Sequence, residues 1–159
     1  MKKKVAAALL ALACLASLAA CGKEESPAAW TTADAQSILD SGAFSEELEE
    51  LDCDMAWMLY RLGDAGLDRK QLTDGAVRRS AGATCEELAV LIFDSEGAAE
   101  TAKKALEDYI QSQIDSNRDY RPGEVPKLEG KWLDQRGNTL LLVVADDLNA
   151  AQTAVDGSK

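Results

Sequence analysis

The sequence predicts an α+β fold in which an antiparallel sheet of about four strands packs against helices that lie mainly on one face. Two pairs of short segments are each joined by small or turn-forming residues, which is typical of hairpins. The first pair, 74–81 with 86–93, is rich in Val, Ile, Leu and Phe, and the second pair is 127–135 with 139–146. An amphipathic segment, 94–116, separates the pairs. With two helices before and one after, the expected order is ααββαββα, and paired hairpins around a helix favour the α+β class.

Two helices are expected before the first hairpin. Thr31 or Thr32 can cap a helix over 33–42, with Asp34 in its first turn and Gly42 just past its end. The segment 46–62 has leucine and methionine at spacings of three and four residues, which predicts a second helix with a break near Asp52. Its methionine and aromatic side chains indicate core packing rather than a cofactor site.

The remaining elements have clear ends. Ser95 is the expected cap of the long helix, and its apolar face carries alanine, leucine, tyrosine and isoleucine. The segment 118–126 contains two prolines and a glycine, which cannot continue a helix. The run 139–146 is apolar on both alternating faces, as in an inner strand. A last helix over 146–157 has Asp146 or Asp147 as cap and Gly157 beyond its end.

The first twenty residues have the layout of a secretory signal peptide. Lys2, Lys3 and Lys4 precede an uncharged run from Val5 to Leu18, which is shorter than the roughly 18 residues that a membrane-spanning helix needs. Residues 18–21, Leu-Ala-Ala-Cys, resemble a bacterial lipobox, in which the cysteine receives a diacylglycerol group. We therefore expect a signal peptide at 1–20, a tether at 21–32 anchored through Cys21, and one domain at 33–157. Such a protein is exported and held at the outer face of the cytoplasmic membrane.

Composition limits the partners of this domain. Without the three signal lysines the chain has 14 basic and 28 acidic residues, a net charge of about -14, which repels nucleic acid. Cys14 leaves with the signal peptide, so Cys53 and Cys85 are the one pair that could form a disulfide in an oxidising compartment. The sequence does not show whether their Cβ atoms are close enough, so it leaves open whether the two cysteines form a disulfide.

No catalytic motif is found. The chain has no histidine, which excludes Ser-His-Asp and Cys-His sites, and it has neither a G-x-S-x-G nor a G-x-G-x-x-G motif. Asp115, Asn117 and Asp119 have the spacing of a calcium loop, but its required glycine and glutamate are missing, which leaves at most a weak cation site. Adjacent acidic residues such as Glu86 and Glu87 point to opposite faces of a strand. We expect a protein that is not an enzyme and uses no cofactor.

Four segments together resemble a known family. They are "AFSEELEELDCDMAWMLYRL", "SAGATCEELAVLIF", "YRPGEVPKLEG" and "GNTLLLVVADD", and the most specific parts are Gly82 to Val90 and Tyr120 to Leu128. The chain is similar over about 33–156 to the family called domain of unknown function 4358, small lipoproteins of Gram-positive, clostridia-type bacteria. The resemblance implies an exported, lipid-anchored domain and supplies no catalytic residues. Cys53 and Cys85 stand where acidic or small residues are expected in relatives.

Two functions remain in competition. The leading hypothesis is a non-enzymatic surface lipoprotein, attached to the membrane through diacylglycerol on Cys21, that binds an unidentified protein or envelope component. The alternative is a module that binds a small ligand or cation and serves a transporter. A single domain of this length offers no cleft between two lobes, which disfavours the alternative.

Overall fold

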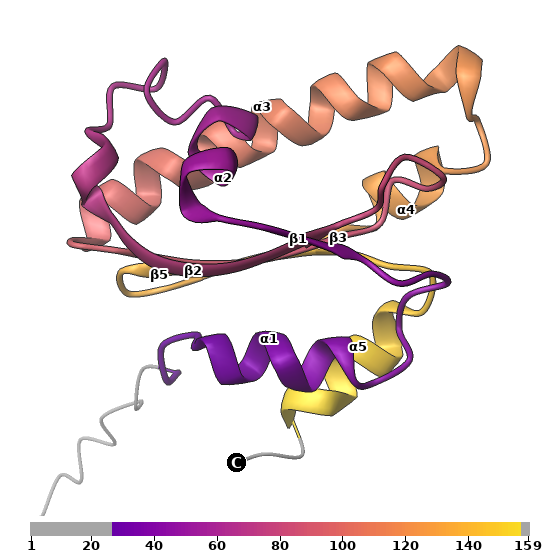
Figure 1. Ribbon diagram of the computed structural model, residues 1–159, viewed down its shortest axis with the longest axis horizontal. Helices are drawn as coiled ribbons and strands as arrows, with labels where there is room; N and C mark the ends of the chain where they lie inside the picture. The colour runs from indigo at the N-terminus through magenta and orange to yellow at the C-terminus, as the bar shows by residue number, and fades with distance from the viewer. Residues whose placement is uncertain (1–26, 157–159) are drawn as a thin grey trace, which may run out of the picture.

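The computed structural model describes residues 27–156, which form one five-stranded antiparallel sheet with helices on both faces (Figure 1). The α+β class is confirmed. The elements run in the order α1 (Thr32–Leu39), β1 (Glu49–Leu51), α2 (Cys53–Leu59), a short 3-10 helix (Arg69–Gln71), β2 (Leu72–Arg79), β3 (Glu87–Phe93), α3 (Glu96–Tyr120), α4 (Val125–Glu129), β4 (Trp132–Arg136), β5 (Thr139–Val144) and α5 (Leu148–Asp156).

The two predicted hairpins form the body of the sheet. The strand order is β1-β2-β3-β5-β4, so β3 and β5 lie at the centre and join the hairpins, with Val90 opposite Leu141. Both central strands are almost entirely buried. The prediction that 139–146 contains an inner strand is confirmed.

The predicted count of four strands is wrong because residues 49–51 form a fifth. Leu48, Leu51 and Met55 have helical spacing, yet the chain is extended up to Asp52, and Glu50 pairs with Arg78 on β2. Helix α2 begins only at Cys53, where the Asp52 side chain caps the backbone N–H of Met55. The expected break near Asp52 is therefore confirmed. For residues 49–51, hydrogen bonding to β2 therefore outweighs the helical spacing of the apolar residues.

Helices cover both faces of the sheet, not mainly one. Helices α1 and α5 pack on one side, and α2, α3 and α4 pack on the other (Figure 1). The physical reason is visible in β3, where Leu88 and Val90 face the first layer while Ala89 and Leu91 face the second. Because both faces are apolar, both must be removed from water.

Several predicted ends are confirmed. Thr31 forms a capping box with Asp34 at the start of α1, and Ser95 caps α3. The Asp147 side chain accepts a hydrogen bond from the N–H of Ala150 at the start of α5. Gly157, expected past the end of that helix, lies outside the described residues.

Two boundaries differ from the sequence prediction. Residues 125–129, which overlap the start of the strand expected at 127–135, form helix α4, and the additional helix changes the predicted order. Trp30, expected in the tether, is buried with its backbone N–H bonded to Thr139 Oγ1, so the packed domain starts before residue 33. Within residues 27–156, no helix is long and apolar enough to cross a membrane.

Candidate functional site

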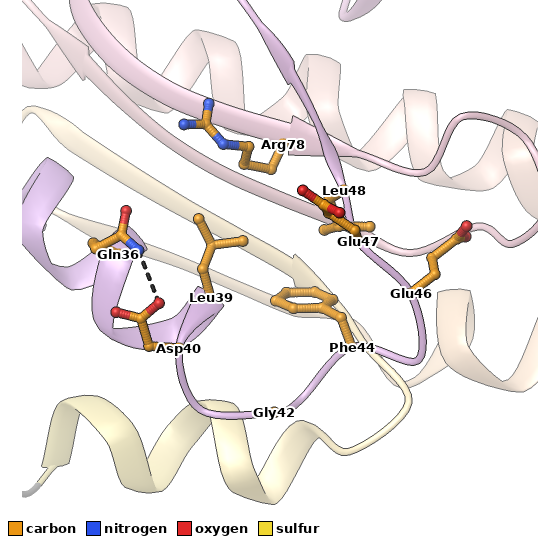
Figure 2. Close-up of a pocket in the computed structure, with 9 residues that line it drawn as sticks. All are labelled: Gln36, Leu39, Asp40, Gly42, Phe44, Glu46, Glu47, Leu48 and Arg78. Atoms are coloured by element: carbon orange, nitrogen blue, oxygen red, sulfur yellow. Dashed lines mark hydrogen bonds between the residues drawn. The ribbon is translucent and has the colours of Figure 1, made fainter.

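A groove opens where the chain passes from α1 to β1, and Figure 2 shows the side chains that line it. Its volume is about 370 Å³. Leu39 and the ring of Phe44 lie side by side in its middle, and Arg78 reaches over them from β2 (Figure 2). The groove is therefore apolar at its centre and charged at its rim.

The connection after α1 positions Phe44. Gly42 adopts a positive φ of 76°, a conformation that glycine takes readily, and the chain turns there toward the sheet. The carbonyl of Ala43 then accepts a hydrogen bond of 2.9 Å from the N–H of Asp147, which ties this loop to the start of α5. Phe44 follows directly and remains half-buried.

Glutamates surround this apolar centre, and they are not equivalent. The Glu46 carboxylate accepts hydrogen bonds of 2.6 Å from both Ser80 and Thr84, and these bonds lower its pKa from the ordinary value. Glu47 and Glu49 are exposed, and within residues 27–156 neither carboxylate has an ion-pair partner. Glu46 therefore holds the loop in place, whereas Glu47 and Glu49 present uncompensated negative charge.

A second hollow of about 600 Å³ continues the groove along β1, since Glu47, Leu48 and Arg78 line both. Arg78 is held by Glu50 at 3.0 Å, and its side chain is only 23% exposed. The continuous surface carries five carboxylates and a single arginine; the acidic residues are Asp40, Glu46, Glu47, Glu49 and Glu50. We call this surface the acidic groove.

The acidic groove has the chemistry to hold a cationic, extended ligand. Lysine and arginine side chains combine an apolar stem with a charged end, so their stems can lie on Phe44 and Leu39 while their charges face the rim. The groove is not arranged as a metal site. In the part of the chain that the structure describes, no three carboxylate or thiol groups lie close enough together to hold a metal ion.

The neighbouring carboxylates Glu86 and Glu87 do point to opposite faces of the sheet, as predicted from strand geometry. Glu86 accepts hydrogen bonds from the backbone N–H and the hydroxyl of Ser45, and its carboxylate forms an ion pair with Lys127 at 2.8 Å. Glu87 accepts hydrogen bonds from Tyr60 and, at 2.7 Å, from Tyr109. Their separate surroundings exclude joint action on one substrate.

Burial and neighbouring charges shift the pKa values of Glu87, Tyr60, Tyr109 and Lys127. Burial raises the pKa of Glu87, although the hydrogen bonds from both tyrosines and the charge of Arg79 favour its ionised form. Burial also raises the pKa of Tyr60 and Tyr109, and the Glu87 charge adds to this effect. Partial burial would lower the pKa of Lys127, but its hydrogen bond to Glu86 and the attraction of Glu86 and Glu124 outweigh burial and raise it.

The structure does not bring Cys53 and Cys85 together. Both thiols are free; Cys53 Sγ lies beside Gly75, and the N–H of Cys85 donates to Glu124. Gly75, beside Cys53, and Arg79 lie four residues apart on β2, which is about 13 Å at the usual rise per residue. Arg79 pairs with Glu87, which is two residues from Cys85, so the two cysteines lie in separate regions of the sheet. A disulfide needs Cα atoms within about 7 Å.

The other predicted site residues lie apart or outside the described residues. Asp115, Asn117 and Asp119 lie within α3, where Asn117 is buried and donates to the carbonyl of Gln113. The exposed Asp115 accepts from Gln111 instead of joining them. The lipidation residue Cys21 lies outside the described residues.

A comparison with protein families completes this picture. The chain belongs to the family described as domain of unknown function (DUF4358), whose model matches residues 56–145, more than half of the chain. No curated protein and no solved structure matches the sequence. The matched region includes β2 to β5 and α3, whereas most of the acidic groove precedes it.

Sequence reasoning did not identify the acidic groove. Four glutamates among residues 46–50 do indicate a local concentration of negative charge. In the helix predicted for this segment, however, their side chains would point in different directions around the axis. Phe44 gave no signal of its own, because its exposure depends on the turn at Gly42.

Proposed function

We propose that this protein is an exported lipoprotein, anchored through Cys21 at the outer face of the membrane, that holds a basic segment of another protein in the acidic groove. The lipobox-like sequence 18–21 supports the anchor. The observation that carries the binding function is the groove itself, in which the exposed, unpaired Glu47 lines the same hollow as the half-buried ring of Phe44 (Figure 2). The exposed, unpaired Glu49 lines the hollow that continues the groove along β1.

A protein segment fits this groove better than other cationic ligands. A lone divalent cation needs several converging oxygen ligands, whereas these carboxylates are spread along the rim on both sides of an apolar centre. An extended segment with several lysine or arginine residues meets the charges and covers the aromatic ring at once. Opposite charges also speed the encounter of the two partners.

The anchor is tested by replacing Cys21 with serine. We expect the native chain to incorporate a clickable fatty acid during growth and to sediment with membranes, because two acyl chains give stable attachment. The Cys21→Ser chain should lose the label and leave the membrane fraction. A variant of the second signal-peptide cysteine, Cys14→Ser, is the matched control and should behave as the native chain. Unchanged labelling of Cys21→Ser would contradict the anchor.

The binding site is tested by crosslinking in intact cells. A photoreactive azidophenylalanine replaces Phe44 in the groove or, as control, Tyr120 at the C-terminal end of α3, which is 88% exposed and does not line the groove. We expect a defined adduct from position 44 that maps to a segment rich in lysine and arginine, and none from position 120. Equal adducts from both positions, or an adduct to an acidic segment, would contradict the proposal.

A further inference from the structure

A second cavity, on the opposite side of the sheet from α1, lies between α3 and the turn that follows α2. Its volume is about 440 Å³, within the range of small-molecule sites. One wall is a single stripe of α3 that includes Lys104, Asp108 and Tyr109, and the other wall includes Arg61 and Asp64. The acidic groove shares no residue with this cavity.

Arg61 stands in an unusual backbone conformation at this cavity. Its φ of 53° makes it the only residue other than glycine with positive φ within the described range 27–156. The hydrogen bonds from Leu62 N–H to Trp57 and from Arg61 N–H to Met58 form the turn that commonly ends a helix, in which this position is usually glycine. An arginine here costs about 1 kcal/mol relative to glycine. The chain places a guanidinium at the cavity despite that cost.

The cavity walls carry balanced charge. Arg61 and Lys104 are cationic, and Asp64 and Asp108 are anionic. Arg61 is held by Asp64 at 2.7 Å, and Lys104 is held by Glu100 outside the cavity. Among residues 27–156 the Asp108 carboxylate has no ion-pair or hydrogen-bond partner. The cavity thus offers an exposed guanidinium that is paired with Asp64 on one wall and a free carboxylate on the other.

The aromatic residues of the cavity form a fixed, mainly apolar base. Tyr60 and Tyr109 pack edge to face with ring centroids 5.1 Å apart, and both hydroxyl groups donate to Glu87. Because those hydroxyls are already engaged, the rings offer carbon surface rather than new hydrogen bonds. Ala65 and Ala105 add further apolar surface.

We propose that this cavity binds a small zwitterion of the amino-acid type, a function separate from the binding of a basic segment in the acidic groove. The ligand carboxylate binds Arg61, its ammonium group binds Asp108, and its side chain packs on Tyr109 and Ala105. A simple anion bound at Arg61 would face the unpaired Asp108 carboxylate, and a simple cation bound at Asp108 would leave the Arg61 wall without a ligand group. A ligand with both charges separated by a short apolar body satisfies both walls.

The proposal is tested by calorimetric titration of the full-length protein in detergent with each of the twenty common L-amino acids. We expect at least one to bind, and its N-acetyl and its amide derivatives to bind at least tenfold more weakly because each lacks one charge. Binding of both derivatives as tightly as the parent, or no binding by any amino acid at millimolar concentration, would overturn the proposal.

Two variants locate the site. Arg61→Gly removes the guanidinium and relieves the backbone, so it should keep or raise the melting temperature while weakening binding at least tenfold. Asp108→Asn should weaken binding similarly, whereas the adjacent control Glu107→Gln, whose side chain does not line the cavity, should not. Unchanged binding by Arg61→Gly and Asp108→Asn would place the ligand elsewhere. Replacing Glu47 and Glu49 with lysine should leave this binding intact, which separates the two sites.

Discussion

Glu86 and Glu87 are adjacent in the chain and both are buried, yet each is stabilised differently. Glu86 has a direct cationic partner in Lys127, whereas Glu87 relies mainly on two tyrosine hydroxyls, with Arg79 farther away at 3.6 Å. A buried carboxylate without a close cation favours its neutral form. The two residues should therefore respond differently to substitution.

Glu87 should make the fold relatively more stable in acid. Its folded pKa lies above the ordinary value of 4.5, so its contribution is complete below that pH and is lost as pH rises through the folded pKa. In Glu87→Gln this titration is absent. We expect the free energy of unfolding of the native protein, minus that of the variant, to be smaller at pH 7 than at pH 4. Urea unfolding of both proteins at the two pH values measures it, and a difference that grows toward pH 7 would contradict the assignment.

At the scale of elements, strands β2 to β5 and the helix caps were predictable because their signals are local. The apolar run in β5 and the caps Thr31 and Ser95 depend on neighbouring residues in the chain. Strand β1 was not predictable, because three residues flanked by leucines at helical spacing become a strand only by pairing with β2. Helices on both faces could have been inferred, since β5 is apolar on both sides.

Helix α4 is held by ion pairs of Lys127 as well as by its buried Leu128. Its five residues include Lys127, whose ammonium group lies 2.8 Å from Glu86, 3.3 Å from Glu124 and 3.4 Å from Asp146. A five-residue helix has little stability of its own. The pair with the fully buried Glu86 therefore joins α4 to the sheet.

Lys127→Met should destabilise the protein by about 3 kcal/mol, because it leaves the buried Glu86 carboxylate without its cation. Adding Glu86→Gln to that variant should restore part of the loss, since the remaining group is neutral. The exposed Lys70→Met is the control and should change stability by less than about 0.5 kcal/mol. Chemical unfolding of the four proteins measures these effects, and a cost for Lys127→Met no greater than for the control would show that the pair does not hold α4.

At the scale of the whole molecule, the two candidate sites lie on different sides of one sheet. The acidic groove is built from the end of α1, the loop to β1 and β2, and the zwitterion cavity is built from the turn after α2 and from α3. Neither could be predicted from the sequence, because each joins residues from separate elements. The general acidity was predictable, and it agrees with a domain that attracts basic partners.

The proposed position of the domain follows from the short segment before it. Among residues 27–156, Trp30 is the first deeply buried side chain, and fewer than ten residues separate it from Cys21. Even fully extended, at about 3.5 Å per residue, this segment spans no more than about 30 Å. Under the lipoprotein proposal the domain stays beside the membrane, where its partner must also be exposed.

The most direct measurement is crosslinking from azidophenylalanine at position 44 in intact cells, repeated with Glu47 and Glu49 replaced by lysine. If the acidic groove holds a basic segment, the adduct should fall at least tenfold in the charge-reversed protein, and should persist when Glu107 and Asp119 on α3 are reversed instead. Both proteins have the same net charge, so the comparison isolates the groove. An adduct that survives reversal of Glu47 and Glu49 would contradict the proposed function.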